Sequence, residues 1–213
     1  MWSAFNAGGK TLFLEEDPKW VDTVLKGDKS HFLRAHTVKY PTQLQQSNEL
    51  LRSYKSEPGC LPPKTFLKGN RRCRLALPDL PQEVYETEWD LVMDGAIYSA
   101  AVMARNRKGK GLTDVFLHDV NRPVERTYAT EFLCKKNLVD GTGRLWHFRI
   151  PPVRDEGAEA PRASANSPPH FTNFLASTSD PPSTPPAKSR RRPRERLKKE
   201  STHCPPHSVS GRR

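Results

Sequence analysis

The chain has 213 residues, of which 35% are hydrophobic and 20 are prolines, so one large hydrophobic core is not expected. Its formal net charge of +11 favours anionic partners such as nucleic acid. No apolar run approaches the roughly 20 residues of a membrane helix, and the first ten residues lack the apolar core of a secretory signal. We therefore expect a soluble intracellular protein that does not bind a membrane.

The four cysteines do not form a recognisable pattern. Cys60, Cys73, Cys134 and Cys204 include no Cys-x-x-Cys pair and no cysteine and histidine cluster with zinc-ligand spacing. The sequence therefore predicts neither a disulfide framework nor a metal site, and it favours a reducing compartment in which lone thiols persist.

Residues 1–80 are predicted to be a helical and connector region. Asp17 followed by Pro18 is a typical helix start, and Gly27 is a suitable stop. A second amphipathic run begins after Pro41 and continues until Pro58 interrupts it. The proline-rich stretch that follows reads as a connector with one strand at 73–77.

Residues 84–150 are predicted to be a small antiparallel β-barrel. Side chains alternate with period two in four segments, 87–93, 98–102, 115–119 and 146–150. Asp94-Gly95 is a hairpin signal, and residues 106–111 form a basic turn that contains glycine. The predicted fold class is therefore α+β, with N-terminal helices, one barrel of the Tudor or SH3 type, and a C-terminal tail.

The tail, residues 151–213, is predicted to be disordered. It carries twelve Lys and Arg against six Asp and Glu and has few apolar side chains, too few to offset the entropy of ordering. A dense basic run in it is predicted to be a nuclear-import signal or a polyanion contact; the alternative is a solvated tail without a partner. Its residues are Lys188, Arg190, Arg191, Arg192, Arg194, Arg196, Lys198 and Lys199.

Catalytic motifs are not recognised in the sequence. It contains no phosphate-binding glycine loop, no Gly-x-Ser-x-Gly and no His-Glu-x-x-His, and its seven histidines are scattered. The sequence therefore predicts a protein that is not an enzyme and that needs no cofactor.

Residues 88–133 resemble a Tudor domain of the survival-of-motor-neuron type. The shared features, in order, are Trp89, the Asp94-Gly95 turn, Tyr98 with Ala100 and Val102, Phe116, Asn121-Arg122 and the closing Glu131-Phe132-Leu133. The resemblance implies an aromatic cage for a methylated cation, with Trp89, Tyr98 and Phe116 as walls, held by cation–π attraction. It also implies that Asn121 orients the ligand, and Asp119 could pair with a methylated lysine. The alternative for these rings is ordinary barrel packing.

We therefore expect a non-enzymatic recognition module for methylated arginine or lysine on a nuclear protein, acting in chromatin or RNA processing. Its expected partners are a methylated protein tail and, through the basic tail, nucleic acid. The expected location is the nucleus, or otherwise the cytoplasm. Two alternatives stay open: a basic RNA- or DNA-associated protein that reads no methyl group, and an assembly subunit that buries Trp89 and Tyr98 against a partner.

Overall fold

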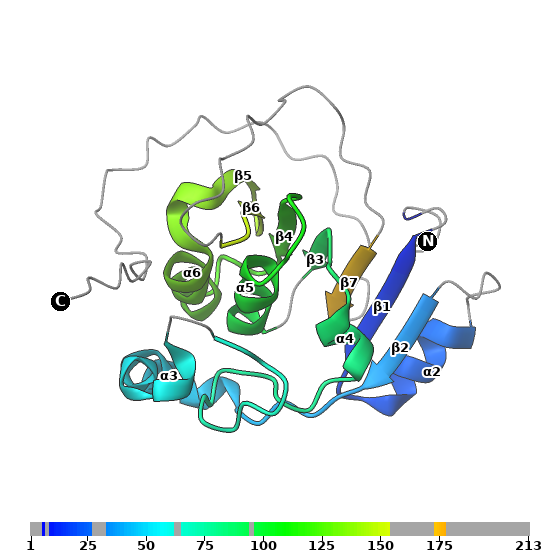
Figure 1. The fold of residues 1–213 in the computed structure, drawn as a ribbon, viewed down its shortest axis with the longest axis horizontal. Helices are drawn as coiled ribbons and strands as arrows, with labels where there is room; N and C mark the ends of the chain where they lie inside the picture. The colour runs from blue at the N-terminus through cyan, green and yellow to red at the C-terminus, as the bar shows by residue number, and fades with distance from the viewer. Residues whose placement is uncertain are drawn as a thin grey trace.

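A seven-stranded sheet is the centre of the protein (Figure 1). The computed structural model describes residues 6, 9–26, 33–61, 65–93, 96–153 and 173–177. The strands are β1 (Lys10–Glu15), β2 (Leu33–Thr37), β3 (Leu91–Met93), β4 (Thr113–Leu117), β5 (Leu138–Thr142), β6 (Leu145–Ile150) and β7 (Asn173–Ser177).

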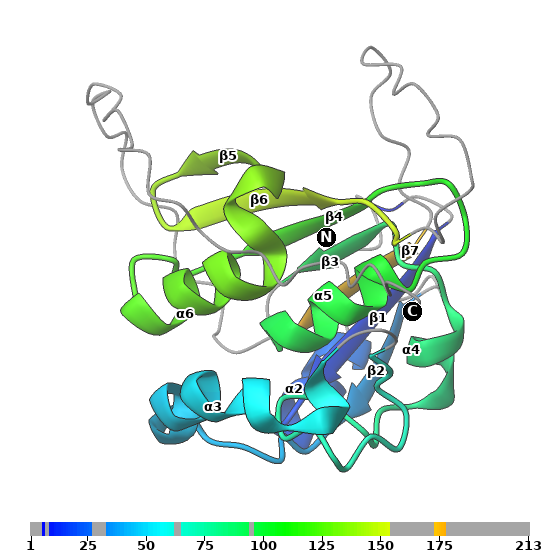
Figure 2. The ribbon, with the colours of Figure 1, turned by 60° about the vertical axis from the view of Figure 1, so that its left-hand side comes forward.

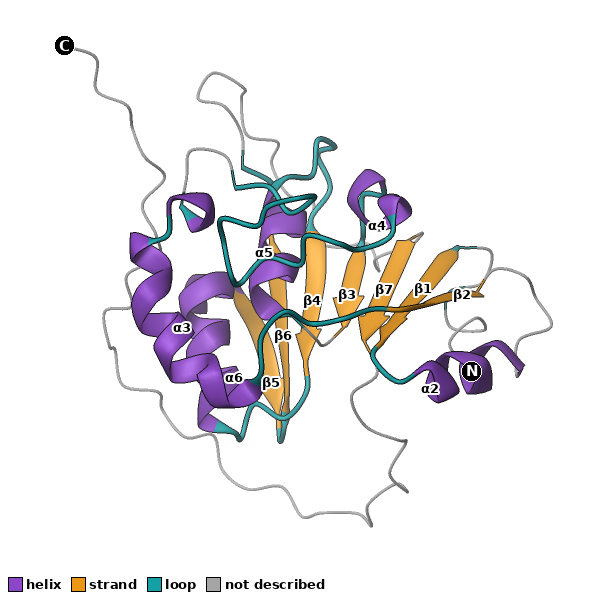
Figure 3. Ribbon diagram, turned by 90° about the horizontal axis from the view of Figure 1, so that it is seen from below, coloured by secondary structure: helices purple, strands orange, loops and turns teal. Residues whose placement is uncertain are grey.

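The sheet is open and mostly parallel. Its strand order is β2-β1-β7-β3-β4-β6-β5 (Figure 3). The first five strands in that order run parallel to one another, and β6 runs antiparallel to both β4 and β5. The structure thus has an open mixed sheet with β2 and β5 at its edges where the sequence predicted a small antiparallel barrel.

Helices connect the parallel strands. The α-helices are α2 (Pro18–Lys26), α3 (Ser47–Ser53), α4 (Gln82–Glu86), α5 (Ile97–Arg105) and α6 (Pro123–Tyr128). Shorter elements are η1 (Leu44–Gln46), η2 (Tyr54–Ser56), η3 (Pro58–Cys60), the π-helical η4 (Ala129–Cys134) and η5 (Lys135–Asn137). Figure 2 shows α5 and α6 along one face of the sheet. None of the helices within the described ranges is long and apolar enough to cross a bilayer.

The helix predicted after Asp17 is confirmed as α2, whose first turn is capped by the Asp17 side chain. Asp17 Oδ1 accepts a hydrogen bond from the Lys19 amide at 2.9 Å. The second predicted helical run is present as η1, α3 and η2, which follow one another from Leu44 to Ser56. The strand predicted at 73–77 is wrong, because those residues form turns.

The strand predicted at 98–102 is wrong, because these residues lie in α5. The helix α5 contains alanine, methionine and arginine, which are strong helix formers. Almost every residue of α5 is buried, so the helix has no polar face and its sequence lacks the period that reveals an amphipathic helix. Asp94-Gly95 lies outside the described residues, but β3 and β4 are parallel and connected through α5, so no hairpin joins them.

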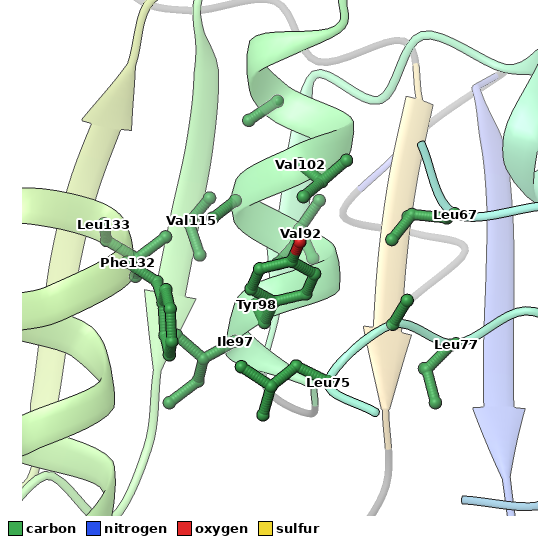
Figure 4. Close-up of a cluster of buried hydrophobic side chains, with 14 of the residues drawn as sticks. Leu67, Leu75, Leu77, Val92, Ile97, Tyr98, Val102, Val115, Phe132 and Leu133 are labelled. Carbon is green, nitrogen blue, oxygen red and sulfur yellow. The ribbon is translucent and has the colours of Figure 1, made fainter. Parts of the chain in front are cut away.

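The main hydrophobic core lies between α5 and the sheet. Figure 4 shows Tyr98 of α5 beside Phe132 of η4, with Val92 and Val115 nearby. The two rings meet edge to face at 5.3 Å between centroids, which is a favourable aromatic geometry. The segment before α4 contributes Leu75 to the same core. Residues far apart in the sequence therefore share one core.

The strand β7 comes from the tail that was predicted to be disordered. It lies in the middle of the sheet, where Leu175 is opposite Leu12 of β1 on one side and Val92 of β3 on the other. Leu175 is 3% exposed. The rest of the tail after Val153, including the basic run at 188–199, lies outside the described residues.

The predicted absence of disulfides is wrong, because Cys60 and Cys73 form a disulfide. It joins η3 to the loop that packs on α5, and the loop it closes has a sequence separation of 13. Beside it, Arg74 donates to the Glu57 carboxylate from its backbone amide and from Nε, at 2.9 Å and 2.8 Å. Burial opposes ionisation of Glu57, but the Arg74 hydrogen bonds outweigh it and lower the Glu57 pKa.

We predict that β7 is required for a stable fold. Without it, β1 and β3 would stand about 10 Å apart, too far for backbone hydrogen bonds, and each would become an open edge. A chain truncated after Val153 should lose cooperative unfolding and aggregate, whereas a chain truncated after Ser177 should keep the unfolding transition of the full chain. Circular dichroism melts and size-exclusion chromatography would measure this, and equal behaviour of the two truncations would contradict it.

We also predict that the Cys60–Cys73 disulfide contributes about 3 kcal/mol to the free energy of unfolding, the value typical of a loop of this length. Replacement of both cysteines by serine should lower the midpoint of urea unfolding accordingly. The double substitution is preferable to a reductant because it changes only this bond. An unchanged midpoint would show that the loop is ordered without the disulfide.

Candidate functional site

The carboxyl ends of the parallel strands share one edge of the sheet. The chain proceeds outward from β1 to β2 on one side of the sheet and from β3 to β4 on the other, and β7 lies between β1 and β3. In open α/β sheets of this kind, ligands bind outside the carboxyl ends, next to the point where the strand order diverges. The residues that follow β1 and β4 are therefore the first candidates for a site.

Asp119 follows β4 in an unusual backbone conformation. Its φ is 57°, in the left-handed region that costs most residues about 1 kcal/mol and that aspartate tolerates better than most. The turn is closed by the Arg122 amide, which donates to the Asp119 carbonyl at 2.8 Å. This conformation turns the chain away from the sheet and leaves the Asp119 side chain buried at its edge.

Three basic side chains surround the Asp119 carboxylate. Arg122 Nη2 lies 2.8 Å from Oδ2, Arg144 Nη2 bonds to Oδ1, and His118 Nδ1 lies 3.2 Å from the same Oδ1. Asp119 has a 6% exposed side chain, whereas His118, Arg122 and Arg144 are 48%, 49% and 58% exposed. A buried carboxylate thus holds three half-exposed basic groups at the surface.

The pairing of β4 with β6 explains why Arg144 reaches Asp119. Leu117 of β4 lies opposite Trp146 of β6, so in this antiparallel register the second residue after Leu117 lies opposite the second residue before Trp146. The Val120 amide donates to the Arg144 carbonyl at 3.1 Å and extends the pairing beyond the strands. The cluster is therefore positioned by the sheet itself.

His118 has the surroundings of a general base. The nearby Asp119 carboxylate favours the proton on Nδ1, which leaves the lone pair on Nε2. Because the imidazole is about half exposed, a substrate hydroxyl can approach Nε2. A histidine next to a carboxylate is an arrangement that enzymes use to remove a proton from a hydroxyl group.

The end of β1 supplies acidic groups to the same edge. Glu15 is buried, and its carboxylate accepts a hydrogen bond from the Asp17 amide at 3.0 Å. Glu16 is exposed beside it. Three strand spacings, about 14 Å, separate the end of β1 from the end of β4, so one ligand of nucleoside size could contact both.

The residues predicted to form an aromatic cage are not brought together. Trp89 is buried in the main core, where Nε1 donates to the Val84 carbonyl at 2.9 Å. Tyr98 is buried in the same core and donates to the Cys60 carbonyl at 3.1 Å; burial raises the pKa of Tyr98 to about 12. Phe116 belongs to a separate cluster and stacks on His147 at 4.3 Å between centroids. The rings are packing elements and leave no shared slot.

The two polar members of the predicted site lie at the carboxyl edge. Asn121 is an exposed turn residue, and Asp119 is the buried centre of the cluster described above. Sequence reasoning missed His118, Arg122 and Arg144 as site residues. The adjacent His118-Asp119 pair was a signal for the first of these, but Arg144 could be found only from the strand pairing.

Within the described residues, one group has the spacing of metal ligands: Glu57, Cys60 and Cys73. The disulfide between the two cysteines removes both thiolates, and a metal binds cysteine as the thiolate. This group therefore does not support a metal site.

Comparison with known proteins identifies relatives of this chain. Residues 1–148 match the sequence profile of the family IRX15/IRX15L/GXM. The chain is 58% identical over 167 residues to arabinogalactan O-methyltransferase 1 of Arabidopsis thaliana, which covers 72% of this chain and 57% of that protein. It is 40% identical over 168 residues to glucuronoxylan 4-O-methyltransferase 2 of the same plant, covering 72% and 56%.

A more distant relative is protein IRREGULAR XYLEM 15 of Arabidopsis thaliana, 33% identical over 171 residues, with 70% of this chain and 50% of that protein covered. The chain thus spans little more than half the length of these relatives. No solved structure matches it.

These matches correct the functional predictions. The Tudor resemblance is wrong, because the family match covers the segment 88–133 that carried it. The predicted non-enzymatic reader in chromatin or RNA processing is wrong, because the most similar relatives reported above are named as O-methyltransferases. The nuclear location inferred from that reader is wrong for the same reason, since those names refer to arabinogalactan and glucuronoxylan. Binding of a methylated protein tail or of nucleic acid stays a prediction.

We predict that the charge of Asp119 stabilises the carboxyl edge. Asp119→Asn keeps the shape and tolerates the positive φ, so it isolates the loss of charge. Hydrogen bonds to a charged group typically contribute about 1.5 to 3 kcal/mol, and the half-exposed arginines can recover water, so we expect a loss of about 1 to 2 kcal/mol in urea unfolding. Asp140→Asn, at an exposed position, is the control; equal stability of the two variants would disprove the prediction.

Proposed function

Because the chain belongs to the IRX15/IRX15L/GXM family, we propose that it is the part of a polysaccharide O-methyltransferase that carries the acceptor-activating residues, and that its acceptor is of the arabinogalactan type. The observation that carries this proposal is the 58% identity over 167 residues to arabinogalactan O-methyltransferase 1. Identity to glucuronoxylan 4-O-methyltransferase 2 is lower, at 40%, which favours arabinogalactan as the acceptor.

The geometry of the carboxyl edge supports this function. A sugar hydroxyl is a weak nucleophile, so its proton must be removed as its oxygen attacks the methyl carbon. The His118 imidazole, half exposed and with Nδ1 3.2 Å from Asp119 Oδ1, is suited to accept that proton on Nε2. In the proposed reaction the oxygen–carbon bond forms, the carbon–sulfur bond of a sulfonium methyl donor breaks with its electron pair on sulfur, and the proton passes from Nε2 to water.

The methyl donor is a second substrate, and the opposite part of the edge suits it. A sulfonium donor with a nucleoside group offers ribose hydroxyls, which a carboxylate binds well. Exposed Glu16, directly after β1, supplies such a carboxylate. The ends of β1 and β4 are about 14 Å apart, so one donor molecule could contact both.

We predict that the purified chain transfers tritium-labelled methyl from S-adenosylmethionine to arabinogalactan. His118→Gln should lower the transfer rate about 100-fold, the lower end of the usual contribution of a general base. Scintillation counting of the precipitated polysaccharide measures both.

His36→Gln is the matched control, because His36 is also a partly exposed histidine paired with a carboxylate, Glu83, at 2.7 Å. His36 lies on β2, the outermost strand on the side of the sheet away from β4 and β6. The substitution should therefore leave the transfer rate within a few-fold of the original. If the folded chain transfers no methyl while arabinogalactan O-methyltransferase 1 does so in the same assay, the proposal is wrong.

A further inference from the structure

The strand at the centre of the sheet comes last among the described strands. In doubly wound sheets the central strand is usually the first along the chain. Here the order β2-β1-β7-β3-β4 has β7 in that position. The family match ends at residue 148, and β7 begins only at Asn173. The part of the chain that matches the family therefore forms a slot between β1 and β3, and the tail supplies the strand that fills it.

The residues along this slot define the segment that fits it. β7 pairs in parallel with β1 on one side and with β3 on the other, and its central residue, Leu175, is buried opposite Leu12 and Val92. Apart from Lys10 at the amino end, the other residues in register with β7 are uncharged: Thr11, Phe13, Leu14, Leu91 and Met93. A charged side chain at the central position would be buried without a partner, which is strongly unfavourable.

The strand β7 is a weak occupant of this slot. None of its five residues is β-branched, and Asn173 and Ala176 are of types that are depleted in strands. A gap of about 20 Å³ remains beside Leu175, bordered also by Leu80 and Met103, and this is room for about one water-sized group. Unfilled space in a core lowers stability. A segment with better strand formers would therefore bind in the slot more tightly than β7 does.

The covalent link to β7 decides which outside partner can compete. A strand tethered to its own slot has an effective concentration of the order of 1 mM. A second copy of this chain carries the same weak strand, so at micromolar concentration it does not displace the tethered one. The partner that fits the slot is therefore a separate polypeptide with a stronger strand.

The slot also leads to the candidate site. Because the pairing is parallel, the carboxyl end of β7 lies beside Leu14 of β1 and Met93 of β3. Ligands of such sheets bind outside the carboxyl end of the central strands. Any segment that fills the slot would bring the residues that follow it to the carboxyl edge.

We propose that the slot between β1 and β3 is a strand-binding site. Its partner is an uncharged, β-branched segment of another protein, which displaces β7 and pairs in parallel with both strands, a form of β-strand addition. The binding of such a segment does not require methyl transfer by the chain.

The test uses the full chain with a protease recognition sequence inserted after Ala160, cut only after the protein has folded. β7 is then held without a covalent link, and native mass spectrometry follows its exchange for an added peptide. The peptide consists of residues 171–179 with Asn173→Val and Ala176→Val. The matched controls are the natural sequence 171–179 and the valine peptide with Leu175→Asp.

The valine peptide should replace the cut fragment at about tenfold lower concentration than the natural sequence, since strand propensities span about 1 kcal/mol per residue. The Leu175→Asp peptide should be at least about 100-fold weaker, because its charge would be buried. No exchange by an excess of the valine peptide, or equal exchange by the Leu175→Asp peptide, would overturn the proposal.

A second measurement locates the bound peptide in the uncut chain, which keeps its own β7. A nitroxide at the carboxyl end of the valine peptide should broaden the Glu16 amide resonance most, and one at the amino end should broaden that of Lys10. Broadening centred on the edge strands β2 or β5 would show pairing outside the slot and contradict the proposal. Dimers of the uncut chain at micromolar concentration would identify a second copy as the partner and contradict the choice of a separate protein.

Discussion

The whole sheet depends on backbone pairing between β7 and its two neighbours. β1 and β2 form one pair of strands, and β3, β4, β6 and β5 form a second group. The five residues of β7 join the two groups by parallel hydrogen bonding on both sides, and Leu175 inserts into the main core. The ends of β1 and β4 share one edge of the sheet because this central strand fixes their distance and direction.

Signals between residues adjacent in the sequence were sufficient to predict single elements of the fold, but not the order in which the strands pair. The capping signal at Asp17 and Pro18 predicted α2, because capping depends on residues adjacent in sequence. The buried α5 was mistaken for a strand, since a helix with no solvent-facing side has no diagnostic period. The strand β7 could not be predicted, because its stability comes from Leu12 and Val92, far away in the sequence. The Cys60–Cys73 disulfide was missed because its spacing matches no motif.

The candidate site was only partly predictable for the same reason. Asp119 was predicted as a site residue alongside the Tudor resemblance, as a carboxylate that could pair with a methylated lysine, and the structure places it at the centre of a cluster of basic groups. Its actual partners include Arg144, which comes near it only through the antiparallel register of β4 and β6. The aromatic residues were misleading, because Tyr98 and Trp89 are suited equally to a cage and to a core, and sequence alone does not distinguish the two.

The place of β7 in the chain also affects how the protein is made. On the ribosome, β1 is synthesised almost 160 residues before β7. At the usual 5 to 20 residues per second, the nascent chain waits about 8 to 30 seconds before its central strand emerges. During that interval the edge of β1, and later that of β3, lacks its native partner. Chaperones that protect open strand edges would therefore have their greatest effect on the yield of this protein while translation is still under way.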